Sequence, residues 1–521
     1  MFKTRIIYPF LFGLYPILFL FSHNIGQLSI FDEKSVLELV VSIGVTLCGV
    51  WLLWLLVNGI FKNRYKSGIV VSIIVSVFFI IGHKPELGGN FMLNHLQIRK
   101  EGNSNFGLFL IMWKVFVLMF LTFCFYALYR IKKDISTSTR IFNVIAVLLV
   151  ILPVVNIAVY ETRRAIEVKQ LKIGEMQPFT EKEKHPPNKM AEGLLPDIYY
   201  IILDQYAAAS TIEENAGFDN SPFLEALRKK GFFVASQSRS NYAYTNLSLA
   251  SSLSMRYLND IADRLGRKSK DLQILERVVA HNTVMGFLKT RGYSCINLRS
   301  MWSPTRWNGY ADQDIRCAPF LSVGFLRLLI QKTPLGPLVQ PDRPFQNTTL
   351  CQFSELARLK RADKPFFVFA HIVAPHYPYV FGASGEPVSA AERKGQEEKT
   401  LWVNQCKFVN TKVEELIPRL LAKSGPSPII IIQGDHGLWE PWKPSWTEQF
   451  YMKTKMRILN AYYFPPGDSI PLYESISPVN TFRIIFNHYF RTNYPILDDR
   501  SYYSHVDKSP FDIRDVTDLA R

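Results

Sequence analysis

The sequence predicts a chain in two parts, an α-helical transmembrane domain followed by an extracytoplasmic α/β domain with a mainly parallel sheet covered by helices. Two observations support this division. Long apolar runs are concentrated in the first third of the 521 residues, whereas the remainder alternates short apolar runs with helical patterns. We expect a five-helix transmembrane domain over 1–160, a juxtamembrane connector over 161–194 and the α/β domain over 195–521.

Five apolar runs in the first domain reach or approach membrane length, since a bilayer needs about 20 apolar residues. Charge interrupts them only at Glu38 and Lys114, and they cover 6–21, 36–61, 69–81, 108–128 and 141–160. The third run is the shortest, so a re-entrant segment is the alternative there. For the first run the alternative is a cleaved signal peptide, but four runs follow it and no small-residue cleavage site is evident.

Lysine and arginine indicate the orientation, because cytoplasmic loops are enriched in them. Such residues precede the first run and separate the second run from the third and the fourth from the fifth: Lys3, Arg5, Lys62, Arg64, Lys66, Arg130, Lys132, Lys133 and Arg140. The other two loops have fewer or balanced charges. Five spans with a cytoplasmic amino terminus place everything after Tyr160 outside, which predicts a multi-pass protein of the plasma membrane.

The net charge of +16 raises the question of a nucleic-acid partner. Much of the excess falls in the cytoplasmic loops and in the connector, which contains Pro178, Pro186 and Pro187 and begins as a helix along the lipid surface in our interpretation. We therefore assign the charge to anionic lipid and expect no nucleic-acid partner. The sequence does not determine the oligomeric state.

Cysteine usage agrees with an exported second domain. Cys48 and Cys124 lie inside apolar runs, whereas the four others, Cys295, Cys317, Cys351 and Cys406, follow the last run. An even number in an oxidising compartment predicts one or two disulfides, with three pairings open. No CxxC spacing is present, which argues against a cysteine zinc cluster.

The segment 428–437, PIIIIQGDHG, is the central element of the second domain. Four isoleucines bounded by proline and glycine predict a strand buried on both faces, as in a parallel sheet. Asp435 and His436 then follow at its carboxyl end, where open α/β sheets bind ligands, and the pair offers half of a divalent metal site. A helix-capping Asp beside a surface His is the alternative.

Other predicted strands end at chemistry-bearing residues on the same sheet edge. The run 196–203 ends at Asp204, and the run 366–372 leads to His376 in the segment PHYPY. A late edge pair is expected over 457–464. The strand 366–372 also contains His371, for which a helper role at the site and a core histidine with satisfied hydrogen bonds are both open.

The segment 240–255, SNYAYTNLSLASSLSM, is predicted to be a loop that leads into a helix, with Thr245 close to the helix start. A hydroxyl there lies in the positive field of the helix dipole, which favours a phosphoryl or sulfuryl group on it. A metal held by Asp204, Asp435 and His436 would lower the pKa of the hydroxyl and make it a nucleophile. The alternative is a plain helix cap.

Together these residues resemble a family. A strand-terminal acid, a threonine 41 residues later, a PHxPY segment and then GDHG are similar to the alkaline phosphatase and sulfatase superfamily. Its membrane-anchored branch, the lipoteichoic acid synthases and phosphoethanolamine transferases of bacteria, also has five amino-terminal spans before an extracytoplasmic catalytic domain. The resemblance covers nearly the whole chain.

The resemblance implies roles for residues at matching positions. Thr245 would be the covalent nucleophile and a metal ligand, with Asp204, Asp435 and His436 as the other ligands of one zinc or manganese ion. His376 would be a catalytic residue that transfers protons or binds substrate. Three further residues are implied at the substrate: His371, and Trp302 and Arg306 of the loop that also contains Trp307.

The activity that the resemblance implies is transfer of a phospholipid head group, of phosphoglycerol or phosphoethanolamine type, to a surface glycan or lipid through a phosphothreonine. The alternative is a sulfatase-like hydrolase of phosphate or sulfate esters, although the chain lacks the CxPxR segment of sulfatases. A third possibility is a non-catalytic membrane protein, which the retained threonine, aspartates and histidines disfavour. Two departures leave the donor open: Asp204 stands where the transferases usually have Glu, and no second histidine soon follows His436.

Overall fold

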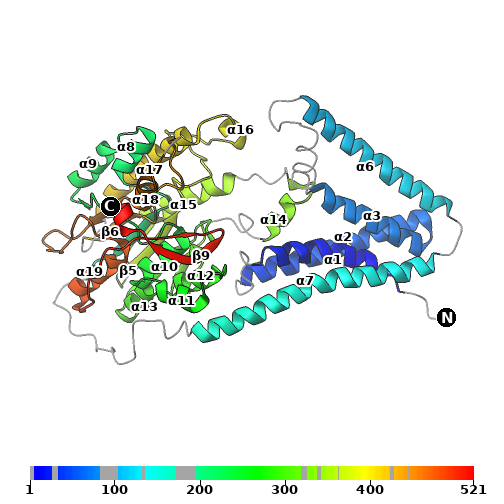
Figure 1. The fold of residues 1–521 in the computed structure, drawn as a ribbon, viewed down its shortest axis with the longest axis horizontal. Coiled ribbons are helices and arrows are strands. Elements are labelled where there is room, and N and C mark those ends of the chain that lie inside the picture. The colour runs from blue at the N-terminus through cyan, green and yellow to red at the C-terminus, as the bar shows by residue number, and fades with distance from the viewer. Residues whose placement is uncertain are drawn as a thin grey trace. The chain divides into compact units, whose positions relative to one another are not determined.

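The computed structural model describes residues 5–25, 33–82, 104–131, 135–171, 195–317, 325–336, 342–361, 363–422, 427–443 and 446–521 (Figure 1). The chain forms two compact units. The first unit contains residues 1–165 and 321–340, and the second contains 166–320 and 341–521. Residues 321–340, which lie within the α/β domain expected over 195–521, belong to the first unit.

Five apolar helices occupy the positions of the five predicted runs. They are α1 (Tyr8–His23), α2 (Glu33–Phe61), α3 (Arg64–Gly82), α6 (Ser104–Arg130) and α7 (Ser136–Leu171). Within the described residues, the spans Val36–Phe61 and Ser136–Arg163 are long and apolar enough to cross a membrane, and Tyr8–His23 and Leu118–Arg130 are shorter apolar helices. The helix α7 continues into the predicted connector, of which 172–194 lie outside the described residues.

The outer surfaces of these helices are apolar. Val45 and Leu56 on α2 are each 69% exposed, and Leu152 on α7 is 68% exposed. A helix that is hydrophobic all round is typical of a membrane span, because lipid replaces the missing protein partner.

A short helix from the later part of the chain completes the first unit. Phe325 begins α14 (Phe325–Gln331), is fully buried and packs its ring 5.1 Å from that of Phe21 near the end of α1. The backbone N–H of Leu326 donates to Glu38 Oε2 near the start of α2, at 3.1 Å. This contact gives Glu38, a charge inside an apolar run, a hydrogen-bond partner.

The second unit is built on a seven-stranded sheet in the order β2-β7-β6-β1-β5-β3-β4. The strands are β1 (Ile198–Leu203), β2 (Phe233–Val234), β3 (Ser294–Leu298), β4 (Gln313–Ile315), β5 (Phe366–Ile372), β6 (Ile429–Gly434) and β7 (Asn460–Tyr463). The five strands from β6 to β4 are parallel to one another. Next to them, β7 is antiparallel to β6, and the edge strand β2 is antiparallel to β7. This confirms the predicted fold class. The late hairpin or edge pair expected over 457–464 is wrong, because one strand, β7, forms there and lies next to the edge strand β2.

Hydrophobic side chains alternate between the two faces of the sheet, so each face has its own core. Tyr200 and Ile431 face one core, which is completed by α10, α12, α13 and α19. Tyr199 and Ile432 face the other, which is completed by α8, α9, α15 and α17. Because both faces are covered, the central strands are apolar over most of their length, as in the isoleucine run of β6.

The helices of the second unit connect these strands, and several of them cover the two faces of the sheet. They are α8 (Ala209–Ala216), α9 (Ser221–Lys229), α10 (Thr245–Ser254), α11 (Asn259–Leu265), α12 (Gln273–Ala280), α13 (Thr283–Thr290), the 3-10 turn η2 (Ser303–Thr305), α15 (Arg343–Arg358), α16 (Ala390–Arg393), α17 (Glu398–Leu421), α18 (Glu448–Met456), α19 (Pro478–Phe490) and α20 (Thr517–Ala520). A separate hairpin pairs β8 (Tyr502–His505) with β9 (Ser509–Asp515).

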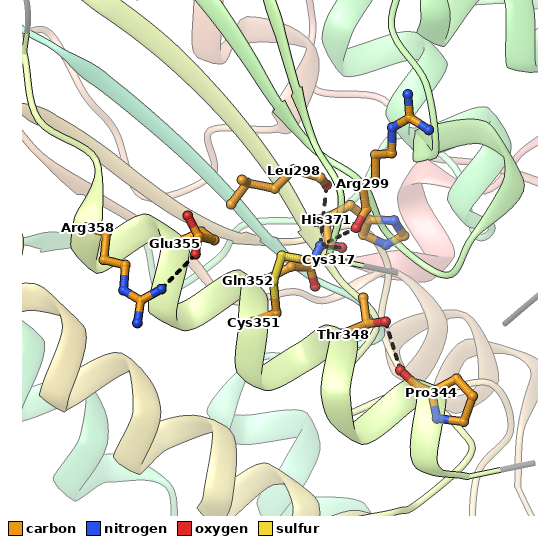
Figure 2. Close-up of a disulfide and its surroundings, with 10 residues drawn as sticks. All are labelled: Leu298, Arg299, Cys317, Pro344, Thr348, Cys351, Gln352, Glu355, Arg358 and His371. Atoms are coloured by element: carbon orange, nitrogen blue, oxygen red, sulfur yellow. Dashed lines mark hydrogen bonds and ion pairs between the residues drawn. A yellow bond between two sulfur atoms is a disulfide. The ribbon is translucent and has the colours of Figure 1, made fainter. Parts of the chain in front are cut away.

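A disulfide joins Cys317 to Cys351 on α15 (Figure 2). Cys295 and Cys406 are both buried and unpaired, so one of the predicted pairings is formed. Next to the disulfide, the Gln352 amide donates to the backbone oxygen of His371 at 2.9 Å and lies 3.4 Å from that of Leu298. Gln352 thus ties the carboxyl ends of β3 and β5 together.

Candidate active site

The sheet register brings two aspartates side by side. Leu203, the last residue of β1, pairs with Gly434, the last residue of β6, so Asp204 and Asp435 leave adjacent strands at the same level. Gly434 cannot be replaced by a larger residue here, because a Cβ would lie 2.2 Å from the backbone oxygen of Tyr206. The close approach of the two strand ends therefore requires glycine.

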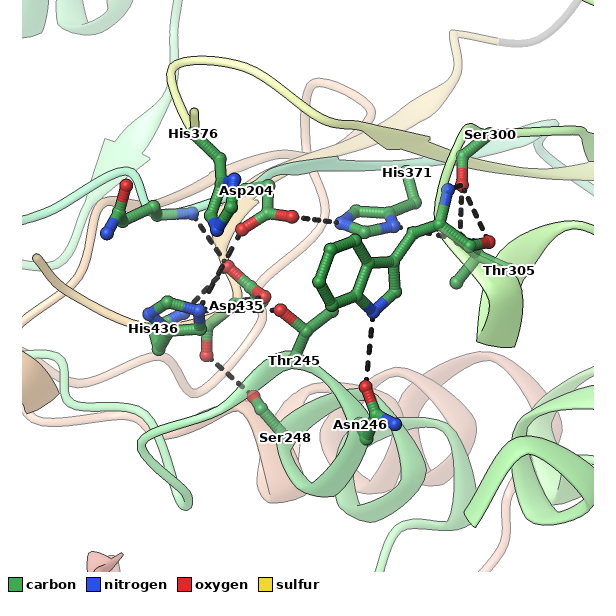
Figure 3. A network of polar contacts seen from close by, with 12 residues as sticks. Asp204, Thr245, Asn246, Ser248, Ser300, Thr305, His371, His376, Asp435 and His436 are labelled. Atoms are coloured by element: carbon green, nitrogen blue, oxygen red, sulfur yellow. Dashed lines mark hydrogen bonds and ion pairs between the residues drawn. The ribbon is translucent and has the colours of Figure 1, made fainter. Parts of the chain in front are cut away.

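Asp204, Asp435 and His436 form a buried cluster whose candidate ligand atoms all lie within 4.8 Å of one another (Figure 3). His436 Nε2 is 3.8 Å from Asp204 Oδ1 and 3.7 Å from Asp435 Oδ2. Asp204 Oδ1 and Asp435 Oδ2 are buried without a hydrogen-bond donor, whereas Asp204 Oδ2 has His371 Nε2 at 3.2 Å. Buried carboxylate oxygens without donors are costly unless a cation balances them.

Hydrogen bonds orient the remaining atoms of this cluster. Asp435 Oδ1 accepts the backbone N–H groups of Gln205 and His436, both at 2.9 Å, which leaves Oδ2 facing the cluster. His436 Nδ1 lies 2.8 Å from the backbone oxygen of Gly437, so Nδ1 carries the proton and Nε2 presents its lone pair. A divalent cation fits this donor set, and carboxylate with imidazole suits zinc or manganese.

Thr245 places its hydroxyl on the same cluster. Its Oγ1 is 3.4 Å from His436 Nε2, and the residue is 5% exposed. Thr245 is the first residue of α10, whose N-cap is Tyr244 and has no side-chain capping bond. The plain helix-cap alternative for Thr245 is therefore wrong, because its hydroxyl faces the cluster instead of the helix backbone.

Residues that the sequence analysis did not single out hold this geometry. Ser248, one turn after Thr245, donates to the backbone oxygen of Asp435 at 2.6 Å and ties α10 to the cluster. Behind the loop, Gly437 donates its N–H to the backbone oxygen of Lys455 at 2.7 Å. The Lys455 ammonium is enclosed by the rings of Tyr244, Trp439 and Tyr451, and burial lowers its pKa to about 8.

His376 and Trp302 lie at the side of the cluster. Their ring centroids are 5.8 Å apart, and the Trp302 indole N–H donates to Asn246 Oδ1 at 3.1 Å, directly after Thr245. His376 Nδ1 lies 2.6 Å from the backbone oxygen of Tyr377, so Nδ1 is the donor of this contact. The Gln405 amide fixes the backbone of His376 at 2.9 Å.

His371 lies behind Asp204. Its Nε2 is 3.2 Å from Asp204 Oδ2, and its Nδ1 is 2.8 Å from Thr305 Oγ1. The side chain is fully buried with both nitrogens engaged. This position fits the alternative of a buried histidine with two polar partners, and a substrate role for His371 stays a prediction.

Arg306 and Trp307 are the other two residues singled out in the loop after β3. Arg306 follows η2 and is half-buried. Trp307 is 48% exposed and packs its edge against His281 at 5.2 Å. A substrate role for Arg306 stays a prediction.

The electrostatics of the cluster favour ionised Asp204. Burial alone would raise the pKa of its carboxyl, but the imidazoles of His376, His371 and His436 outweigh this effect and lower the pKa from 3.8 to about 2. Asp204 is therefore a carboxylate at neutral pH, which is the form that ligates a metal.

No family model and no curated protein sequence matches the chain. Solved structures do match. One is the C-terminal periplasmic domain of EcEptC from Escherichia coli in complex with zinc, with 14% identity, 58% of this chain and 86% of that chain covered, and a TM-score of 0.39. Another is a protein in the alkaline phosphatase superfamily from Vibrio parahaemolyticus, with 13% identity, coverage of 67% and 87%, and a TM-score of 0.38.

A third is the integral membrane lipooligosaccharide phosphoethanolamine transferase A from Neisseria meningitidis, with 13% identity, coverage of 80% and 86%, and a TM-score of 0.36. These descriptions name the superfamily and the transferase branch that the sequence resembles. At such identities the likeness concerns the fold.

Proposed function

We propose that this chain is a membrane-anchored, metal-dependent enzyme that moves a phospholipid head group to a surface glycan or lipid through a phosphothreonine at Thr245. One observation supports the proposal above all. The Thr245 hydroxyl lies at the helix start and 3.4 Å from His436 Nε2, over a buried cluster with two carboxylate oxygens, Asp204 Oδ1 and Asp435 Oδ2, that lack donors. A hydroxyl in that position is suited to become a nucleophile.

In the first step, Thr245 Oγ forms a bond to the head-group phosphorus while the bond from phosphorus to the diacylglycerol oxygen breaks. A zinc or manganese ion held by Asp204, Asp435 and His436 would supply charge neutralisation at the phosphate oxygens and lower the pKa of the hydroxyl. The proton of Thr245 passes to solvent. The start of α10 places free backbone N–H groups near the phosphoryl group.

His376 serves as the proton carrier. In its protonated form it gives the Nε2 proton to the leaving diacylglycerol oxygen. The neutral imidazole then takes the proton of the acceptor hydroxyl, which attacks phosphorus and releases Thr245. The bond from Nδ1 to the Tyr377 backbone oxygen keeps Nε2 free for both transfers.

A membrane donor follows from the anchor. The exposed apolar surfaces of α2 and α7 are suited to lipid, so the second unit stays tethered to the bilayer that contains the donor. The disulfide between Cys317 and Cys351 supports an oxidising, extracytoplasmic location for that unit.

We expect a reporter fused after Arg140 to behave as cytoplasmic and one fused after Glu192 to behave as exported. Paired alkaline phosphatase and fluorescent-protein fusions measure this, since each is active on one side only. Cytoplasmic behaviour of the fusion at Glu192 would overturn the span count or the orientation, and with it the proposed location of Thr245.

Product analysis tests transfer against hydrolysis. The full chain in detergent, with manganese or zinc and phosphatidylglycerol or phosphatidylethanolamine labelled in the head group, should release diacylglycerol. Addition of a glycolipid acceptor should speed this release and move the label to the acceptor. Label found only as a free head-group phosphate, at a rate that no acceptor changes, would support the hydrolase instead.

A further inference from the structure

A continuous row of buried polar groups extends from the metal cluster into the loop after β3. His371 Nε2 lies 3.2 Å from Asp204 Oδ2, His371 Nδ1 lies 2.8 Å from Thr305 Oγ1, and Thr305 Oγ1 lies 2.6 Å from Ser300 Oγ (Figure 3). All four side chains are at most 1% exposed. We call Asp204, His371, Thr305 and Ser300 the Asp204–Ser300 network.

The chemistry of the groups fixes the direction of every contact. A carboxylate that ligates a metal only accepts, so His371 presents Nε2–H to Asp204 and its Nδ1 must accept. Thr305 has a single proton and gives it to Nδ1, so Ser300 donates to Thr305 at 2.6 Å rather than to the backbone oxygen of Trp302 at 3.2 Å. Ser300 in turn accepts the backbone N–H of Trp302 at 2.9 Å.

The network ends at Ser300, which contacts Trp302 at the side of the candidate active site. Trp302 lies with its ring 5.8 Å from that of His376, and its indole N–H bonds Asn246, the residue after the proposed nucleophile. Gln352 holds the backbone of both His371 and the loop after β3. Its amide donates to the backbone oxygen of His371 and lies within 3.5 Å of the backbone oxygen of Arg299 (Figure 2). Without the Thr305 hydroxyl, Nδ1 of His371 would be buried without a donor.

We propose that Thr305 and His371 are positioning residues that couple the metal ligand Asp204 to Trp302, so that metal binding and the placement of the substrate-facing wall depend on each other. The inference rests on the proposed function in that Asp204 holds a metal and Trp302 faces the substrate. Neither Thr305 nor His371 touches the reacting atoms. Their effect passes through Asp204 at one end and Trp302 at the other.

The test compares Thr305→Val, which keeps shape and removes the hydroxyl, with Thr305→Ser, which restores it. Metal affinity is measured without substrate, by competition of zinc or manganese with a chromophoric chelator, on the full chain in detergent. Thr305→Val should weaken binding by about 10- to 100-fold, as loss of an outer partner of a metal ligand does. Thr305→Ser should bind nearly as the wild type.

Thr481→Val is the matched control. Thr481 is also buried and its hydroxyl also pairs with another hydroxyl, that of Tyr462 at 2.8 Å, but it lies on α19 outside the network. We expect this variant to bind metal as the wild type does. Ser300→Ala provides a second variant in the network, with a smaller effect in the same direction because its change is one contact further from Asp204.

The second readout follows Trp302 itself. The nine tryptophans are replaced by 5-fluorotryptophan, and the ¹⁹F signal of Trp302 is assigned by its loss in Trp302→Phe. Metal addition should shift this signal in the wild type and in Thr305→Ser, and much less in Thr305→Val. If Thr305→Val does not fold, Ser300→Ala and the wild-type signal decide the question.

The proposal is overturned if Thr305→Val or Ser300→Ala binds metal with wild-type affinity, or if the Trp302 signal does not respond to metal in the wild type. Neither readout requires turnover. A wild-type chain that binds metal and couples it to Trp302, but transfers no head group, would therefore refute the proposed function and leave the coupling intact. A chain that binds no metal would refute both.

Discussion

Thr245→Val should fold as the wild type and lose nearly all activity. The hydroxyl makes no capping bond, so its removal should change the free energy of unfolding by no more than about 1 kcal/mol. Loss of a covalent nucleophile removes the two-step route, and we expect diacylglycerol release to fall by about 10⁴-fold or more. Initial rates and thermal unfolding midpoints, measured on the same preparations, separate the two effects.

Thr283→Val is the matched control for this variant. Thr283 is likewise buried and likewise the first residue of a helix, α13, but that helix has its own cap at Asn282. Both variants should show similar unfolding midpoints, and only Thr245→Val should lose turnover. Equal activity of the two variants would mean that Thr245 is not the nucleophile.

Asp435→Asn should empty the metal site while preserving the loop. The amide oxygen of asparagine can still accept the backbone N–H groups of Gln205 and His436, so the backbone of the loop should keep its conformation. The oxygen that faces the cluster, however, becomes a neutral amide nitrogen that cannot ligate. We expect metal affinity to fall by more than about 100-fold, beyond the loss of an outer partner, and turnover to fall with it.

Elemental analysis after dialysis measures the metal content, and thermal unfolding with and without added zinc measures its contribution to stability. Asp342→Asn serves as a control, since Asp342 pairs with Arg393 at 2.8 Å and is not a member of the cluster. Metal content equal to the wild type in Asp435→Asn would contradict the assignment of this cluster as the metal site.

The sequence predicts much of the second unit because its central strands obey a simple rule. Strands buried on both faces are apolar over most of their length, as in 366–370 and the isoleucine run of β6. Residues that follow parallel strands meet at one edge, which is why Asp204 and Asp435 could be placed together before the register was known. The predicted superfamily resemblance depended on the same residues.

Contacts between distant loops could not be predicted in this way. Thr305 reaches His371 across 66 residues, and no local pattern indicates that pairing. The sequence left three connectivities open for the four cysteines and could not select the pair Cys317 and Cys351. The sequence analysis also did not predict that 321–340 belong to the first unit, because the apolar residues of α14 would fit the core of either unit.

The measurement that tests the account most directly is the mass of the peptide that contains Thr245 after brief incubation with phospholipid and metal. The chain is quenched in acid, digested and analysed by mass spectrometry, with Thr245→Val in parallel. The account predicts an added head-group phosphate on Thr245 in the wild type, which disappears faster when an acceptor is supplied and is absent from the variant. Turnover of phospholipid by a wild type whose peptide never carries this mass, or an adduct that persists in Thr245→Val, would contradict it.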